Sequence, residues 1–154
     1  MDASALVDYL LRTPRGEDVA PSIEDRDADL NTPALCDVEV VAGLRRALLS
    51  GLISEQRALQ AIEDHLDLPL TRHGHARLLH RTLALRDNFS AYDATYVALA
   101  ERVDAELLTS DTPFARAVRR HTKIGTLPGD EDDHGLRLLR QAPSACARAE
   151  RRPA

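Results

Sequence analysis

The sequence predicts one α/β domain with a short, mainly parallel central sheet flanked by helices. Short apolar runs that end in polar residues alternate with stretches of helical periodicity, which is typical of strands joined by helices around a parallel sheet. The 154 residues are enough for a single domain with a substantial core. Apolar residues make up 44% of the chain, with no Trp, one Met and two Phe, so Leu, Val and Ala must fill that core. We expect the domain to cover residues 1–127, followed by an acidic loop and an Arg- and Ala-rich tail over 128–154.

The first half of the chain predicts four helices and two short strands. Thr32 and Pro33 suit a helix cap and a first helical residue, Gly51 is a common C-terminal signal, and Ser54 opens the next helix. The expected helices are 4–11, 16–25, 33–50 and 54–66, and the expected strands are 29–31 and 68–71.

The second half predicts three more helices and two strands before the pattern fades. A helix is expected over 75–86, another begins after a cap at Ser90, and a third covers 112–120. The expected strands are 106–109 and 123–127. Residues 129–135 form an acidic loop, and residues 142–154 have so little to bury that we expect them to be disordered.

The composition argues against several classes of protein. The formal charge of −5 argues against broad, sequence-independent binding of nucleic acid through a basic surface, because that mode needs clustered Lys and Arg. Cys36 and Cys146 give no disulfide framework and fit a reducing compartment, which makes the cytoplasm the expected location. No run approaches the ~20 apolar residues of a membrane span, and the N-terminus lacks the features of a signal peptide.

Glu39 is the acid that is hardest to explain as a surface residue. On a helix, its neighbours three and four positions away are all uncharged, namely Leu35, Cys36, Ala42 and Gly43. Burial of an unpaired carboxylate is costly, so such a residue normally has a cation, a metal or a shifted pKa. The alternative interpretation is an ion pair with Arg45 or Arg46, or a side chain that reaches solvent.

Three further acids stand at junctions between elements. Asp93 follows Ser90 at the third helical position, which also fits a capping box. Asp111 follows a short apolar run, at the carboxyl end of a strand where open α/β sheets bind ligands, and it also fits a helix cap. Asp2 precedes an apolar helix, and its alternative role is that of an ordinary solvated terminus.

The four acids have a common explanation if the fold gathers them around a cation. Two carboxylates about 4 Å apart repel by roughly 4 kcal/mol at an effective dielectric of 20, so clustering requires protons or a cation. Hard oxygen ligands of this kind suit Mg²⁺ or Mn²⁺. We therefore expect a divalent metal site, as in a nuclease, built from Asp2, Glu39, Asp93 and Asp111.

The segments that carry the four acids have a family likeness. They are Asp2-Ala-Ser4, Asp37-Val-Glu39-Val-Val-Ala-Gly-Leu-Arg-Arg46, Ala91-Tyr-Asp93-Ala-Thr-Tyr-Val-Ala-Leu-Ala100 and Leu107-Leu-Thr-Ser-Asp111. In order and spacing they resemble the acidic motifs of PIN-domain ribonucleases, and most closely those of the VapC-type toxins of bacterial toxin–antitoxin pairs. The likeness covers residues 1 to about 127, and its most specific part is the Tyr-Asp-Ala helix followed by Leu-Thr-Ser-Asp.

The resemblance implies a PIN-like fold and metal-dependent cleavage of single-stranded RNA. The four acids would surround Mg²⁺ or Mn²⁺, with Asp2 and Asp93 as principal ligands and with Ser4, Thr109 and Ser110 beside the site. It also implies a homodimer and a cognate VapB-type antitoxin that blocks the acidic pocket. Two other functions stay open at this point. One is a non-catalytic module whose pocket receives a basic segment of a partner, and the other is a PIN-like nuclease of RNA maturation or DNA processing.

Overall fold

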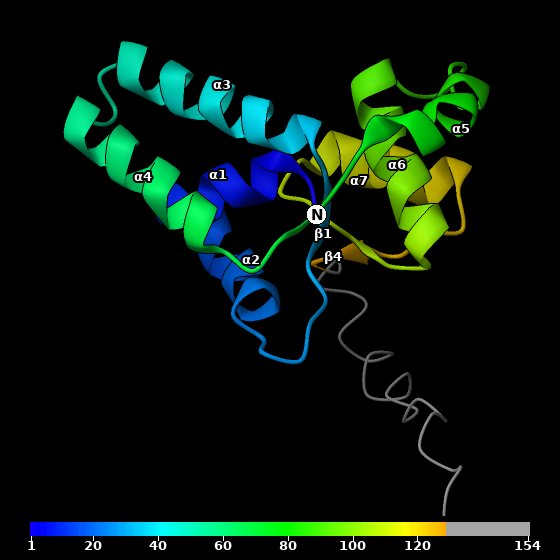
Figure 1. The fold of residues 1–154 in the computed structure, drawn as a ribbon, viewed down its shortest axis with the longest axis horizontal. Coiled ribbons are helices and arrows are strands. Elements are labelled where there is room, and N and C mark those ends of the chain that lie inside the picture. Colours follow the sequence, from blue (N-terminus) through cyan, green and yellow to red (C-terminus); the bar gives the residue numbers. More distant parts are fainter. Residues whose placement is uncertain (129–154) are drawn as a thin grey trace, which may run out of the picture.

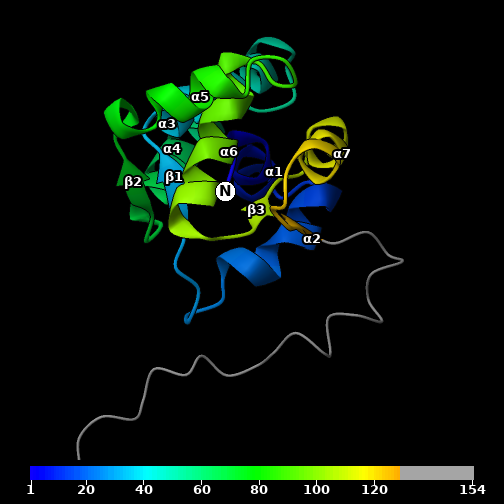
Figure 2. The same ribbon diagram turned by 90° about the vertical axis from the view of Figure 1, so that its right-hand side faces the viewer.

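Two pairs of short parallel strands lie on either side of the N-terminus in the computed structural model, which describes residues 1–128 (Figure 2). The four strands are β1 (Asn31–Pro33), which pairs with β2 (Thr71–His73), and β3 (Leu107–Leu108), which pairs with β4 (Thr126–Leu127). The expected short parallel strands are confirmed. The acidic loop and tail expected after residue 128 lie outside the described residues.

The first two residues link the two pairs of strands. The Met1 amine donates a hydrogen bond to the carbonyl oxygen of Asn31 at 2.9 Å, and the Asp2 N–H donates to the carbonyl oxygen of Leu108 at 3.0 Å. The Met1–Asp2 backbone therefore lies in line between β1 and β3, as a strand would.

Helices cover the strands on both faces. They are α1 (Ala3–Leu11), α2 (Pro14–Ile23), α3 (Leu35–Leu49), α4 (Glu55–Asp67), the 3₁₀ turn η1 (His75–Arg77), α5 (Leu79–Ala84), α6 (Ala91–Val103) and α7 (Thr112–His121). The α3 and α4 helices form a hairpin that projects to one side, and α5, α6 and α7 gather on the other side of the N-terminus (Figure 1). No helix of residues 1–128 is both long and apolar enough to cross a membrane.

The core is aliphatic, as the composition predicts. Every residue of α6 from 94 to 100 is buried, so this helix runs through the interior and packs on all sides. The largest side chains with almost no exposure include Leu6, Val40, Val97 and Leu107, which come from four different elements. Burial of this kind is the main driving force for the fold.

Gly16 allows α2 to pack closely against α1. A Cβ atom at this position would collide with the carbonyl oxygen of Asp8, at a separation that real Cβ atoms do not adopt. The Thr13 hydroxyl accepts a hydrogen bond from the Gly16 N–H at 3.1 Å and donates one to Asp8 Oδ1 at 2.7 Å. The turn between the two helices is therefore fixed by a cap and by the absence of a side chain.

The start of α3 differs from the prediction. Thr32 and Pro33 belong to β1, where the Thr32 hydroxyl donates to the carbonyl oxygen of Met1 at 3.1 Å, and the helix begins only at Leu35. Ala34 offers no side-chain cap, and the Leu35 N–H donates instead to Nε2 of His75 at 3.0 Å, forty residues away. Pairing with distant segments therefore outweighs the local helix signal.

Other elements also begin at different residues from those predicted. The first strand begins at Asn31, and the second begins at Thr71, because these two residues pair in register. The single helix expected over 75–86 is divided into η1 and α5, since the Leu78 N–H donates to the carbonyl oxygen of His75 in a three-residue turn.

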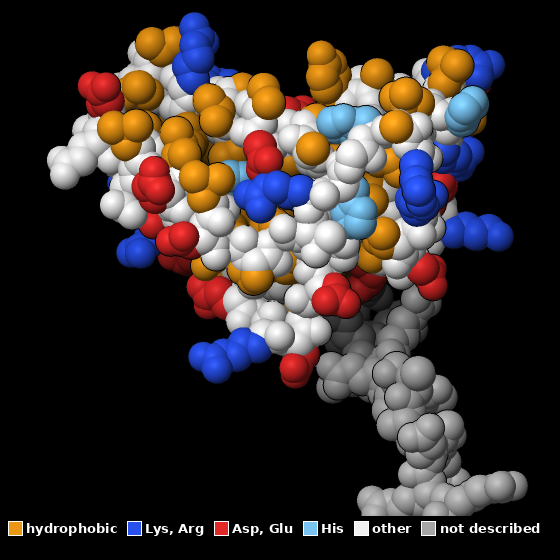
Figure 3. Space-filling view, in the orientation of Figure 1, with side chains coloured by type: hydrophobic (Ala, Val, Ile, Leu, Met, Phe, Trp, Pro, Cys, Tyr) orange, Lys and Arg blue, Asp and Glu red, His pale blue; other side chains and the backbone are white. Residues whose placement is uncertain are grey.

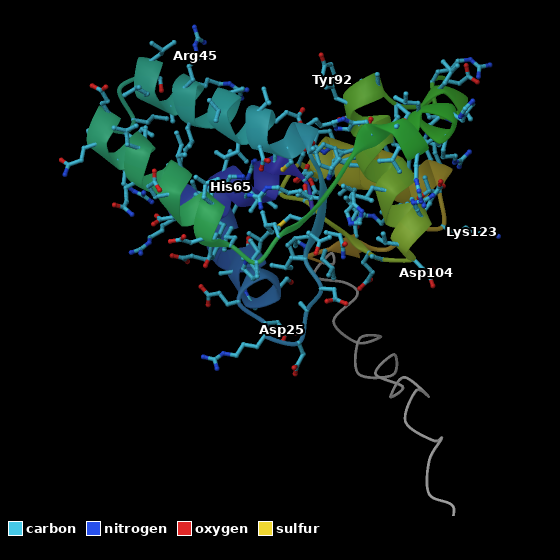
Figure 4. The ribbon with its side chains drawn as sticks, viewed as in Figure 1. Asp25, Arg45, His65, Tyr92, Asp104 and Lys123 are labelled. Atoms are coloured by element: carbon cyan, nitrogen blue, oxygen red, sulfur yellow. The ribbon has the colours of Figure 1, made fainter. Side chains whose placement is uncertain are left out.

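A charged cluster ties the projecting hairpin to β2. His65 on α4 is buried, and its Nε2 lies 2.8 Å from Oδ1 of Asp37 on α3 (His65 is labelled in Figure 4). The Arg72 Nε–H donates to both carboxylate oxygens of Asp37 at 2.9 and 3.0 Å. Burial tends to raise the pKa of Asp37, but the hydrogen bonds from His65 and Arg72 outweigh it and hold that pKa below its ordinary value.

Candidate metal centre

Asp2 is a buried carboxylate held by hydroxyl and amide donors. It caps α1, where its Oδ1 accepts hydrogen bonds from the Ala5 N–H at 3.1 Å and from the Ser4 hydroxyl at 2.8 Å. Its Oδ2 accepts one from the Thr109 hydroxyl at 2.7 Å. The residue is only 6% exposed, and burial raises the pKa of its carboxyl against the opposing effect of these donors.

Hydroxyl groups from two distant segments meet beside Asp2. Ser4 Oγ lies 3.2 Å from Oγ1 of Thr109 and accepts a hydrogen bond from the Ser110 N–H at 3.1 Å. The Ser110 hydroxyl donates to Oδ2 of Asp8 at 2.5 Å. Ser4, Thr109 and Ser110 thus lie where the sequence placed them. Asp8 was missed, although it stands four residues after Ser4 on the same helical face.

Glu39 is half-buried on α3 and is held by a tyrosine. Its Oε2 accepts a hydrogen bond from the hydroxyl of Tyr96 on α6 at 2.5 Å. Neither Arg45 nor Arg46 forms an ion pair with Glu39 within residues 1–128. Burial raises the pKa of Glu39 and the Tyr96 hydrogen bond opposes this, while the negative charges of Asp2 and Asp93 raise it further.

Tyr96, which donates a hydrogen bond to Glu39, is a residue of this region that sequence reasoning missed. Burial, together with the neighbouring Cys36 and Glu39, keeps the pKa of its phenol far above the usual value, so the hydroxyl remains a donor at any physiological pH. The available signal was its position three residues after Asp93, which places both side chains on one side of α6.

Asp93 takes part in a helix cap and in the acidic cluster at the same time. The Asp93 N–H donates to Ser90 Oγ at 3.1 Å, and the Ser90 hydroxyl donates to Asp93 Oδ2 at 2.8 Å. The capping interpretation is therefore correct. Its charge also contributes to the raised pKa of Glu39, after burial and the charge of Asp2.

Asp111 is an exposed helix cap at the edge of this region. Its Oδ1 accepts a hydrogen bond from the Phe114 N–H at 2.9 Å at the start of α7, and its own N–H donates to Thr109 Oγ1 at 3.0 Å. Its charge is not among the influences on the pKa of Asp2 or Glu39. The charges of Asp2 and Asp93 thus act on the pKa of Glu39, and the Thr109 hydroxyl bonds both to the Asp2 carboxylate and to the Asp111 N–H.

The donor set fits a hard divalent cation. Carboxylates and hydroxyls supply only oxygen ligands, which Mg²⁺ and Mn²⁺ prefer. Two of the carboxyls, Asp2 and Glu39, have raised pKa values that a nearby cation would lower. Within residues 1–128, no group of three or more His, Cys, Asp or Glu side chains lies close enough together to hold a metal ion. The four predicted acids therefore do not form a preassembled ligand group in the described residues.

Known proteins are similar in sequence to this one along most of its length. The model of the PIN domain family matches residues 1–119. Ribonuclease VapC12 of Mycobacterium tuberculosis is 35% identical over 124 residues, which are 80% of this chain and 95% of that protein. Ribonuclease VapC1 of the same organism is 41% identical over 118 residues, which are 76% of this chain and 88% of that protein. Ribonuclease VapC3 of the same organism is 38% identical over 119 residues, which are 76% of this chain and 85% of that protein. With its acids placed as described above, the chain belongs to the PIN-domain family and, within that family, to the VapC-type ribonucleases.

Proposed function

We propose that this protein is the toxin of a toxin–antitoxin pair and that it hydrolyses phosphodiester bonds of single-stranded RNA with Mg²⁺ or Mn²⁺. The metal would be held by Asp2, Glu39, Asp93 and Asp111. The observation that carries the proposal is the buried carboxylate of Asp2, which the hydroxyls of Ser4 and Thr109 hold where two segments far apart in the sequence meet. The membership of the VapC-type ribonucleases supports the same reaction. We expect this activity in the cytoplasm.

Different residues of the chain would have different roles in such a reaction. A bound divalent ion would supply Lewis acidity and would lower the pKa of a water molecule, so that the water can lose a proton and attack phosphorus near neutral pH. Ser4 and Thr109 hold the Asp2 carboxylate in place. Glu39, whose carboxylate is held by the hydrogen bond from Tyr96, is placed to accept a proton in such a reaction.

The decisive experiment replaces one acid and keeps the helix that carries it. In Asp93→Asn, the amide oxygen still accepts the Ser90 hydroxyl, so the fold should survive while the negative charge is lost. We expect the full chain to cleave single-stranded RNA with Mg²⁺, to lose activity in EDTA, and to lose at least about 100-fold as Asp93→Asn.

The matched control is Asp104→Asn at the other end of α6. Asp104 is an exposed C-cap with φ 53°, a conformation that Asn also accepts, so this variant should keep full activity (Figure 4). Cleavage that persists in EDTA, or in Asp93→Asn, would contradict the metal mechanism. A module that only binds a partner would show neither cleavage nor any thermal stabilisation by Mg²⁺.

Exposed apolar side chains support the homodimer that we include in the proposal. Five of them lie on α3, α5 and α6, with exposures from 48% to 71%, namely Val38, Val41, Leu79, Leu83 and Tyr92. Tyr92 points away from the body of the protein (Figure 4). Exposed apolar surface on a folded domain is typical of interaction sites. Leu83→Asp should shift the protein from dimer to monomer in light scattering, whereas Leu59→Asp on α4 should not.

The projecting hairpin supports the second proposed partner, a VapB-type antitoxin. Apolar side chains are visible over α3 and α4 in the space-filling view (Figure 3). The exposed leucines of this region are Leu49, Leu52, Leu59 and Leu66, at 58% to 78%. Expression with and without the neighbouring gene should give growth arrest and new RNA ends only when that gene is absent. No arrest and no new ends would contradict the toxin assignment.

A further inference from the structure

The two carboxylate oxygens of Asp8 hold two separate segments of the chain. Its Oδ1 accepts a hydrogen bond from the Thr13 hydroxyl at 2.7 Å, in the turn between α1 and α2. Its Oδ2 accepts one from the Ser110 hydroxyl at 2.5 Å, in the loop between β3 and α7. Asp8 and both of its partners are half-buried, which strengthens these bonds relative to bonds on an open surface.

The bond to Ser110 connects Asp8 with the residues beside Asp2. A hydroxyl has one proton, and the shorter contact of Ser110 Oγ is with Asp8, since Ser4 Oγ lies at 3.2 Å. Ser4 Oγ accepts instead from the Ser110 N–H at 3.1 Å and donates its own proton to Asp2 Oδ1 at 2.8 Å. The side chain of Ser110 is therefore fixed by Asp8, and its backbone is fixed by Ser4.

The loop that Asp8 holds carries two groups of the candidate metal centre. Thr109, which precedes Ser110, donates to the Asp2 carboxylate at 2.7 Å. Asp111, which follows Ser110, caps α7, and its N–H donates to the Thr109 hydroxyl at 3.0 Å. Peptide groups are planar and rigid, so an anchor on the middle residue of this loop restricts the residues on both sides of it.

We propose that Asp8 is a positioning residue, whose Oδ2 fixes the loop of residues 109–111 and thereby the places of Thr109 and Asp111. In this role Asp8 needs no contact with RNA or with a metal. Its effect on the loop is independent of the proposed function, and its effect on RNA cleavage rests on that function. The two oxygens of Asp8 have different partners, so substitution of Ser110 or Thr13 separates the effect on the site from the effect on the turn.

The first test measures amide exchange in the full chain in EDTA, with no RNA present. Asp8→Ala removes both bonds, and Ser110→Ala removes only the bond to the loop. We expect each variant to lower the protection factor of the Asp111 N–H by on the order of tenfold, relative to that of Val97 in the buried part of α6. The double variant should lower it no further, because both changes remove the same bond.

Thr13→Val is the matched control, because it removes the hydroxyl on the other oxygen of Asp8. The Thr13 hydroxyl also caps α2 through the Gly16 N–H, so this variant should lower Tm by about 2–8 °C. The protection factor of Asp111 relative to Val97 should stay unchanged.

The second test compares kcat and KM for single-stranded RNA with Mg²⁺. Loss of an outer hydrogen bond to a metal site reduces activity by about 10–100-fold. We expect Asp8→Ala and Ser110→Ala each to lower kcat by on the order of tenfold with KM unchanged, since the change affects the geometry of the site and not the binding of RNA. Thr13→Val should keep both constants.

Four results would overturn the proposal. One is an unchanged protection factor at Asp111 in Ser110→Ala, a variant that keeps the Thr13 bond and so tests the loop even where Asp8→Ala does not fold. The second is an additive effect in the double variant, and the third is an equal loss of protection in Thr13→Val. The fourth is an unchanged kcat in Ser110→Ala of a chain that cleaves RNA. A natural chain that does not cleave RNA would contradict the proposed function alone, because the exchange measurement needs no cleavage.

Discussion

The hydroxyl of Thr109 offers a sharp test of how Asp2 is held. Thr109 is 4% exposed and Asp2 is 6% exposed, so water cannot replace the 2.7 Å hydrogen bond between them. Thr109→Val keeps the shape of the side chain and replaces the hydroxyl, which also accepts a hydrogen bond from the Asp111 N–H, by a methyl group. A buried hydrogen bond to a charged group contributes about 1.5–3 kcal/mol to stability. Because each kcal/mol lowers Tm by about 2–4 °C in a domain of this size, we expect a loss of about 3–12 °C at neutral pH.

The pH dependence of this loss identifies its cause. The Thr109 hydroxyl opposes the rise in the pKa of Asp2 that burial produces, so its removal raises that pKa further. The loss in stability should be complete where Asp2 is ionised and should shrink as the pH falls through its folded-state pKa. Differential scanning calorimetry from pH 4 to pH 8 measures this directly.

Thr82→Val is the matched control. The Thr82 hydroxyl is buried and has no hydrogen-bond partner within residues 1–128, so its loss should leave Tm unchanged or slightly raised. The reasoning is refuted if Thr109→Val is as stable as Thr82→Val, or if its loss of stability is the same at pH 4 and pH 8.

Two further predictions concern the acids themselves. Tyr96→Phe removes the hydroxyl that holds Glu39 and so raises the pKa of Glu39, which should move the acid limb of the kcat/KM profile to higher pH. The second prediction concerns the metal-free protein. Because the folded-state pKa values of Asp2 and Glu39 are raised, the stability from these groups is complete below their unfolded values of about 4 and is lost as the pH rises through the folded values. Mg²⁺ should therefore raise Tm more at pH 8 than at pH 4.5 in thermal scans.

Controls for these predictions come from the same chain. Tyr9→Phe removes a hydroxyl that donates to the exposed Glu24 at 3.2 Å, and it should leave the pH profile in place. Asp2→Asn should flatten the pH dependence of stability in EDTA and reduce the effect of Mg²⁺. A profile that is unmoved in Tyr96→Phe, or an equal effect of Mg²⁺ at both pH values, would show that these carboxyls are not the groups that titrate.

Local signals in the sequence proved reliable where the structure depends on local contacts. Ser54 and Ser90 cap their helices as expected, through hydrogen bonds that span three residues. Gly51 follows α3 with φ +75°, a conformation that glycine adopts without strain. Asp111 caps α7. Each of these features is decided within one turn of chain, so neighbouring residues are enough to predict it.

The prediction was wrong where distant segments compete with the local signal. Thr32 and Pro33 look like the start of a helix, yet they form β1 because the chain pairs there with β2 and with Met1. The Leu35 N–H at the start of α3 donates to His75, and no residue near Leu35 in the sequence predicts this contact. The 75–86 segment likewise reads as one helix and is divided in two.

The sequence by itself determined the class of fold, the apolar faces of the helices and the local caps. These features follow from periodicity and from caps, which act over three or four residues. Only the tertiary structure decided that Tyr96 reaches Glu39 across 57 residues, that Asp2 is buried beneath Thr109, and that Met1 joins two pairs of strands. The physical reason is that burial and long-range hydrogen bonds exist only after the chain has packed, and they set which acids are coupled and how strongly.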